Sequence, residues 1–151
     1  MQPIDLDDLN SEKRYLGQQA YKDSKLANVM FTLELARRLQ GTGVTVNCLC
    51  PGFIPNTEFL RNNGTFIRGF CRYIIGGLMR PFLKITRTVE EGGQAIVQLA
   101  VDEKLAGQTG KFFRDFVEDK VSVEATKEQD QQRLWQISEK MVGLESYQGM
   151  D

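Results

Sequence analysis

The chain has 151 residues, with 19 basic and 20 acidic side chains, a formal net charge of −1 and no histidine. This length suits one domain with a buried core, and the balanced charge gives no indication of nucleic-acid binding. The absence of histidine excludes Ser-His-Asp and Cys-His nucleophilic catalysis and the commonest zinc ligands, so we expect no metal site.

The three cysteines form no metal-ligand pattern. Cys48 and Cys50 lie in an apolar run and are expected to be buried thiols of a reducing compartment. No segment has the uninterrupted apolar length of a transmembrane helix, and the polar residues 2–8 do not resemble a signal peptide. We therefore expect an intracellular protein, either cytoplasmic or peripheral to an intracellular membrane.

The first half of the chain predicts a helix followed by a strand. Residues 24–40 carry apolar side chains at helical spacing, and Gly41 and Gly43 end this helix. Residues 44–50 are mostly β-branched or apolar and predict a buried parallel strand. A Pro-Gly pair at residues 51–52 stops that strand.

The second half predicts two more helices and a strand. Residues 53–87 form a long irregular stretch with broken helical character. A capping box at residues 88–91 opens a helix. Residues 110–116 alternate as a strand does. Residues 127–141 predict a last helix, closed by Gly143.

This order of elements predicts the α/β class, and within it the carboxyl-terminal half of a doubly wound, Rossmann-like parallel sheet. A dinucleotide site also needs a glycine-rich turn directly after a strand. Gly41 and Gly43 follow a predicted helix, and Gly92 and Gly93 lie inside one. We therefore expect the phosphate-binding half of the sheet to be absent from these residues, and Met1 to lie partway through the domain.

Tyr21 and Lys25 are the strongest candidates for chemistry. They are four residues apart, so on a helix they share one face. A tyrosine ordinarily holds its proton up to about pH 10, and a neighbouring cation favours the phenolate. The pair is therefore suited to general acid/base catalysis. The alternative is a half-buried tyrosine beside a solvated lysine, a spacing that also arises by chance on helix surfaces.

Three segments resemble, in order and spacing, the second half of a short-chain dehydrogenase/reductase. They are Ala20-Tyr21-x-x-Ser24-Lys25-Leu26-Ala27-Asn28, then Glu34-Leu35-Ala36-Arg37-Arg38-Leu39, then Gly43-Val44-Thr45-Val46-Asn47 leading into Pro51-Gly52. Within that superfamily the chain is similar to the retinol dehydrogenase and protochlorophyllide reductase branch, whose closing helix the run 134–144 resembles. The resemblance spans residues 4–144.

The resemblance implies a role for each matching residue. Tyr21 would be the acid/base that exchanges a proton with the substrate oxygen, and Lys25 would hold the cofactor ribose and tune the tyrosine. Pro51 and Gly52 would shape the turn beside the nicotinamide, with the backbone that follows reaching the carboxamide. The cofactor-binding residues implied are Tyr21, Lys25, Pro51, Gly52, Ile54 and Thr57. The cofactor implied is NADP(H), with NAD(H) left open.

Other polar residues near the pair are expected to be structural. The catalytic serine of the family would lie before Met1, and Ser11 and Ser24 do not fit its position. Tyr15 has no lysine four residues on and is expected to pack. Asn28 is expected to be a helix-surface amide.

Residues 59–89 contain six basic residues and no acidic one, interleaved with aromatic and aliphatic side chains. One interpretation is a substrate lid whose apolar side covers the cleft. The other is a basic, apolar surface that also lies on a membrane. Both suit a lipophilic carbonyl or alcohol as substrate.

The sequence thus predicts one partial short-chain dehydrogenase/reductase domain over residues 1–151. Its parts are a Tyr/Lys helix at 20–40, a Pro-Gly strand end at 44–52, a lid at 53–87 and carboxyl-terminal elements at 88–144. The predicted activity is NADP(H)-dependent interconversion of a carbonyl and an alcohol, absent from these residues alone, and a homo-oligomer is left open. The alternatives are a truncated, non-catalytic product that binds a partner or a full-length relative, and a nucleotide-sugar epimerase.

Overall fold

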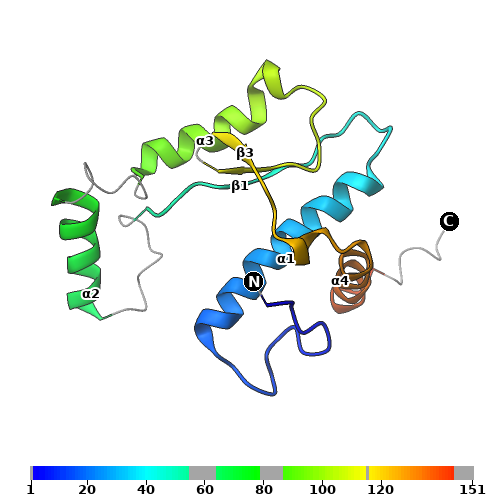
Figure 1. Ribbon diagram of the computed structural model, residues 1–151, viewed down its shortest axis with the longest axis horizontal. Helices are drawn as coiled ribbons and strands as arrows, with labels where there is room; N and C mark the ends of the chain where they lie inside the picture. The colour runs from blue at the N-terminus through cyan, green and yellow to red at the C-terminus, as the bar shows by residue number, and fades with distance from the viewer. Residues whose placement is uncertain (1, 55–63, 79–86, 115, 145–151) are drawn as a thin grey trace. The chain divides into compact units, whose positions relative to one another are not determined.

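The structure is a computed structural model that describes residues 2–54, 64–78, 87–114 and 116–144. In chain order its elements are α1 (Gly17–Arg38), β1 (Cys48–Cys50), α2 (Thr65–Gly69), the π-helix η2 (Phe70–Leu78), α3 (Val89–Val101), η3 (Glu103–Leu105), β2 (Phe112–Arg114), β3 (Val117–Asp119), η4 (Val123–Thr126) and α4 (Glu128–Met141) (Figure 1). This alternation belongs to the α/β class.

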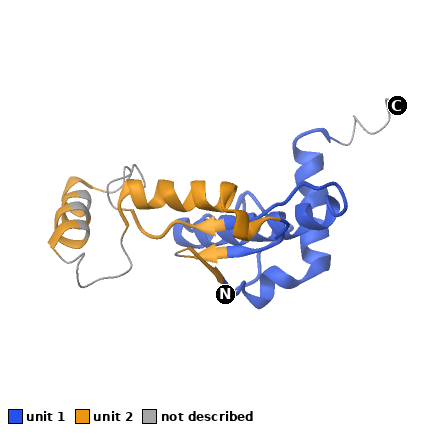
Figure 2. Ribbon diagram, turned by 90° about the horizontal axis from the view of Figure 1, so that it is seen from above, with its two compact units in different colours: residues 1–48, 107–112, 119–151 blue, residues 49–106, 113–118 orange. Residues whose placement is uncertain are grey.

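The chain divides into two compact units (Figure 2). Unit 1 contains residues 1–48, 107–112 and 119–151. Unit 2 contains residues 49–106 and 113–118. The division passes through all three strands.

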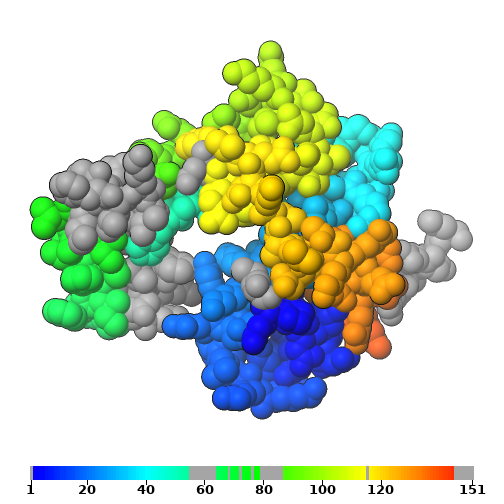
Figure 3. Space-filling view, in the orientation of Figure 1, coloured from blue at the N-terminus to red at the C-terminus, as the bar shows by residue number. Residues whose placement is uncertain are grey.

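Unit 1 is built on the long helix α1, which packs against η4 and α4. Its buried apolar core consists of Leu6, Leu26, Met30, Ala125 and Leu134. Because Leu26 and Met30 are four residues apart, they form one apolar stripe along α1. In the space-filling view the amino-terminal residues lie directly beside the residues around η4 (Figure 3), as the shared core requires.

Polar contacts add to this core. Glu34 is buried, and its carboxylate accepts hydrogen bonds from the guanidinium groups of Arg37 and Arg38. Arg37 also donates to the side chain of Gln131 on α4, whose amide donates to the carbonyl of Ala125 at 2.6 Å. These bonds connect the last turns of α1 to α4 and η4.

An aromatic contact lies beside that network. The rings of Phe31 and Trp135 stack with their centroids 5.3 Å apart, and the Arg38 guanidinium lies 4.4 Å from the centroid of Trp135. The indole nitrogen of Trp135 is buried and has no hydrogen-bond partner among the described residues. The ring therefore stabilises the α1–α4 contact through stacking and cation–π attraction.

The three strands form one sheet in the order β1-β2-β3. Gly110 N–H donates to the Val46 carbonyl at 2.8 Å, and Cys48 N–H donates to the Lys111 carbonyl at 3.0 Å. Donors and acceptors advance together along both segments, so β1 and β2 run parallel, as predicted for residues 44–50. The Asn47 amide fixes this register by donating to the Gln108 carbonyl and accepting from Lys111 N–H.

In unit 2, α3 begins with the predicted capping box. The Thr88 hydroxyl accepts from Glu91 N–H at 3.1 Å, and the Glu91 carboxylate accepts from Thr88 N–H at 2.7 Å. These two bonds satisfy amide groups that a helix start otherwise leaves unpaired. Over the part of the chain that the structure describes, no helix has the length and hydropathy to cross a bilayer.

The observed bounds differ from the predicted ones at three places. Helix α1 begins at Gly17, before the apolar stripe that starts at residue 24 and three residues before the predicted Tyr/Lys helix 20–40, because residues 18–23 are mostly good helix formers. Strand β1 covers only Cys48–Cys50 of the predicted 44–50. The strand predicted at 110–116 is interrupted, since Phe116 has a φ of 68° and the chain turns back there into β3.

Candidate functional site

Tyr21 and Lys25 lie together on the first half of α1. The Lys25 ammonium is 5.4 Å from the centroid of the Tyr21 ring, within the range of a cation–π contact. Tyr21 is 48% exposed, so a solute can reach its ring. The next turns of the same helix are anchored in the core by Leu26 and Met30, so the pair stands on a rigid element.

The polar residues around the pair have structural roles. The Ser24 hydroxyl donates to the Tyr21 carbonyl at 2.8 Å, which satisfies both groups within the helix. Asn28 is exposed on the helix surface, as expected. Ser11 lies in a loop with a φ of 55°. Tyr15 is 71% exposed, so the packing role expected of it is wrong.

The other predicted site residues form a turn in unit 2. Gly52 has a φ of 80°, a conformation that a side chain would strain. The Phe53 carbonyl accepts a hydrogen bond from Arg87 N–H at 2.9 Å. Ile54 packs with its terminal methyl directly beside Gly92 of α3. The turn after β1 is therefore attached to the start of α3, and Thr57 lies outside the described residues.

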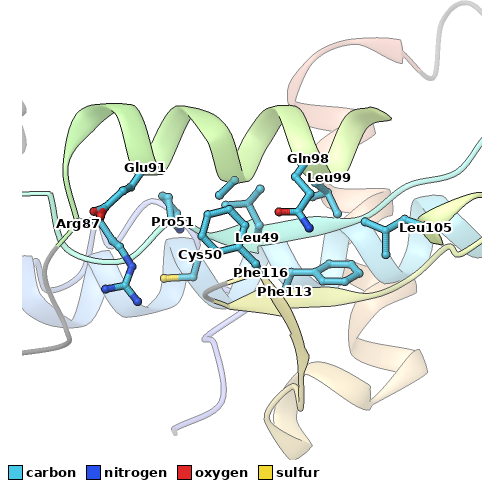
Figure 4. Close-up of a pocket in the computed structure, with 11 residues that line it drawn as sticks. Leu49, Cys50, Pro51, Arg87, Glu91, Gln98, Leu99, Leu105, Phe113 and Phe116 are labelled. Carbon is cyan, nitrogen blue, oxygen red and sulfur yellow. The ribbon is translucent and has the colours of Figure 1, made fainter. Parts of the chain in front are cut away.

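Unit 2 also contains a cavity of about 410 Å³, including the part open to solvent (Figure 4). Its lining residues are Leu49, Cys50, Pro51, Arg87, Glu91, Ala95, Gln98, Leu99, Leu105, Phe113 and Phe116. Figure 4 shows Arg87 and Glu91 at one end and Leu105 at the other, below α3. The lining is mainly apolar and contains neither Tyr21 nor Lys25, so we assign the cavity no chemistry.

Sequence reasoning did not identify this cavity. Phe113 and Phe116 come from the hairpin, and Gln98 and Leu99 come from the last turns of α3. The alternation in residues 110–116 marks Phe112 or Phe113 as an inward-facing side chain. It does not indicate which helix that side chain faces.

The environment of the Cys48 thiol, in the strand that leads to Pro51 and Gly52, shifts its pKa. Burial raises the pKa of Cys48, and a hydrogen bond with the Thr32 side chain partly offsets this. Cys48 and Cys50 are both only partly buried, so the expectation of two buried thiols is met only in part. A raised pKa keeps the sulfur protonated and makes it a poor nucleophile.

The structure thus places the predicted site residues in two groups. Tyr21 and Lys25 are in unit 1, and Pro51, Gly52 and Ile54 are in unit 2.

Comparison with known proteins gives consistent results. A family model described as short chain dehydrogenase matches residues 8–66. The chain is similar to human retinol dehydrogenase 13, at 42% identity over 144 residues, which cover 95% of this chain and 42% of that protein. Human retinol dehydrogenase 14 is 40% identical over 146 residues, covering 93% of this chain and 40% of the relative. Human retinol dehydrogenase 12 is 40% identical over 141 residues, with shares of 93% and 42%. The chain therefore spans about two fifths of the length of these relatives.

Proposed function

Because the chain belongs to the short-chain dehydrogenase family, we propose that it carries the proton-transfer pair and the nicotinamide turn of an oxidoreductase. The reaction is the interconversion of a carbonyl and an alcohol. The single observation that carries this proposal is the placement of the Lys25 ammonium 5.4 Å from the centroid of the exposed Tyr21 ring. Family membership of the segment that contains the pair supports it.

The two side chains of the pair have different roles in the proposed reaction. Tyr21 donates a proton to the substrate oxygen in reduction and accepts it in oxidation. Lys25 carries a positive charge next to the phenol and can donate up to three hydrogen bonds, which suits the hydroxyls of a ribose. The core contacts of Leu26 and Met30 hold both side chains in register along α1.

The turn after β1 is the part of the chain that we propose lies beside the nicotinamide. Proline at position 51 has no amide hydrogen, and the positive φ of Gly52 changes the direction of the chain after the strand. The cofactor we propose is NADP(H), held by Tyr21, Lys25, Pro51, Gly52 and Ile54, with Thr57 also assigned to this site. The nicotinamide, when bound, supplies or accepts the hydride.

The substrate class we propose is a lipophilic alcohol or aldehyde. Support comes from the relatives, which are named retinol dehydrogenases. Further support comes from the segment that we propose as the lid, residues 59–89, because it exposes large apolar side chains. Those exposed within its described part are Phe66, Ile67, Phe70, Tyr73, Leu78 and Val89.

A second role for the same segment is contact with a membrane surface. Its six basic residues and lack of acidic ones complement anionic lipid head groups. The exposed aromatic side chains of α2 and η2, Phe66 with 85% of its surface exposed among them, would enter the head-group boundary. We propose peripheral contact through this face, in addition to the lid role.

The test uses a chain restored to full length, in which the amino-terminal part of a retinol dehydrogenase relative precedes these 151 residues. Tyr21→Phe keeps the ring and removes the transferable proton, so turnover of an aldehyde panel should fall by about a hundred- to ten-thousand-fold while NADPH still binds. Lys25→Met should lower turnover and, unlike Tyr21→Phe, should also weaken NADPH binding. The matched control is Tyr15→Phe, because Tyr15 lies on the same part of the chain and has no lysine four residues on. Near-normal turnover by Tyr21→Phe would refute the proposal.

The 151 residues alone should not turn over substrate. They correspond, in this proposal, to the carboxyl-terminal half of a doubly wound sheet. Gly41 and Gly43 follow a helix, and Gly92 and Gly93 lie inside one, so neither pair is the phosphate-binding turn that follows a strand. Micromolar NADPH binding with steady turnover by the purified 151-residue chain would overturn this part. Absence of turnover together with stable binding to a longer relative would instead favour the binding role.

A further inference from the structure

Gly92 lies at a close contact between α3 and the turn after β1. It is the fourth residue of α3 and is buried. A β-carbon at this position would lie 2.5 Å from Cδ1 of Ile54, and 3.8 Å from both Cγ1 of Ile54 and Cβ of Pro51. Carbon atoms at optimal contact are about 3.5–4.0 Å apart, so the first of these contacts is a collision. Only a residue without a side chain fits between α3 and Ile54 as they stand.

The contact belongs to a larger junction. One turn before Gly92, the Arg87 amide donates to the Phe53 carbonyl at 2.9 Å. Between them the capping box of Thr88 and Glu91 fixes the first turn of α3. The backbone hydrogen bond of Phe53 and the steric contact of Ile54 therefore both attach the turn of residues 51–54 to the start of α3.

The neighbouring Gly93 provides an internal comparison. It is exposed, and a β-carbon there would meet no described atom within 4 Å. Glycine inside a helix is unfavourable relative to alanine because it loses more backbone freedom on folding. At position 92 the contact with Ile54 explains why a glycine is present despite this cost. At position 93 the described residues give no such explanation.

We propose that Gly92 is a positioning residue for the cofactor site. It allows Ile54 to seat against α3 and so fixes the turn of residues 51–54. This inference rests on the proposed function, in which that turn contacts the nicotinamide. Gly92 itself does not touch the cofactor, and it acts through Ile54 and Pro51.

The perturbation is Gly92→Ala. The added methyl group collides with Cδ1 at the end of the Ile54 side chain, which must either rotate about χ2 or move away together with its backbone. Because χ1 of a β-branched residue is restricted, we infer that part of this movement passes to the turn of residues 51–54. The gain in helix propensity opposes the packing loss, so the midpoint of thermal unfolding should change little. A merely structural glycine would show the opposite pattern, with lower stability and unchanged cofactor affinity.

The experiment measures NADPH affinity in the chain restored to full length for Gly92→Ala, Gly93→Ala, Ile54→Val and the double variant of Gly92 and Ile54. Gly92→Ala should raise the dissociation constant and KM for NADPH about tenfold, the change expected if the displaced turn loses about 1.4 kcal/mol of its contact with the cofactor. Gly93→Ala should bind as the wild type does. Ile54→Val deletes the colliding Cδ1, so the double variant should bind NADPH as well as Ile54→Val alone.

A second measurement separates this inference from the proposed function. The Arg87 amide should exchange its hydrogen faster in Gly92→Ala than in Gly93→Ala, because its acceptor Phe53 lies in the displaced turn. Equal exchange and equal NADPH affinity in the two glycine variants would overturn the role of Gly92. If the wild type binds no NADPH, the proposed function fails, and the exchange difference still decides whether Gly92 positions the turn.

Discussion

The hydrogen bonds of buried Glu34 with Arg37 and Arg38 predict unequal losses of stability. Removing both arginines should lower the free energy of unfolding more than removing the charge of Glu34. Glu34 is 3% exposed, and its two carboxylate oxygens accept from Arg37 and Arg38, the latter at 2.6 Å. Both arginine side chains are more than one third exposed. An arginine that loses Glu34 can therefore return to water, whereas Glu34 without both arginines stays buried as an unpaired charge.

The magnitudes follow from this asymmetry. Replacing Arg37 and Arg38 together by methionine should lower the free energy of unfolding by about 3–5 kcal/mol, the usual cost of leaving a buried charge unpaired. Glu34→Gln keeps the side-chain volume and one acceptor, so it should cost about 1 kcal/mol. Adding Glu34→Gln to the double arginine variant removes the unpaired charge. That triple variant should therefore be more stable than the double variant.

The assay is urea unfolding of the purified chain, followed by circular dichroism and by the fluorescence of the single tryptophan, Trp135. Trp135 stacks on Phe31 at the α1–α4 contact and reports its loss. If the double arginine variant loses no more stability than Glu34→Gln, or the triple variant is the least stable of the three, the reasoning about the buried carboxylate is wrong.

Two further predictions concern the thiol beside α1 and the basic segment. Because burial raises the pKa of Cys48 above its ordinary 9.0, iodoacetamide should modify this residue more slowly in the native chain than in urea. Equal alkylation rates in the native and the denatured chain would contradict the burial of Cys48. The free energy of unfolding should also fall as the pH rises from about 9 through the raised pKa of the native thiol. The wild-type protein should co-sediment with anionic liposomes and be released by salt. Replacing Arg68 and Arg72 by glutamate should abolish binding, and salt-insensitive or absent sedimentation leaves only the lid role.

Features set by short stretches of sequence were predictable. The capping box of α3 was identified from Thr88 and Glu91 because both partners lie within one turn. Helix α4 spans Glu128–Met141, within one residue of the predicted start, because its leucine, tryptophan and isoleucine have a clear helical period. The Tyr21–Lys25 contact was likewise predictable from a spacing of one helical turn.

Features set by contacts between distant segments were not predictable. The interruption at Phe116 follows from the hairpin, where a phenylalanine adopts a φ usually left to glycine. The cavity depends on how β2 faces α3, which no local pattern encodes. Gly92 looked like an unfavourable residue inside a capped helix, and only its distance to Ile54 gives the reason for it. The π-helical winding of η2 also has no sequence signal that we recognised.

The α1–α4 pairing has a consequence for synthesis on the ribosome. Arg37 and Gln131 are separated by 94 positions, and Arg133 and Asp7 by 126. The chain emerges amino terminus first, so α1 leaves the exit tunnel long before its partner helix exists. During that interval the apolar stripe with Leu26 and Met30 is uncovered and open to chaperones. Most of unit 2 is the continuous stretch 49–106. This stretch can therefore fold before α4, the last helix of unit 1, has been synthesised.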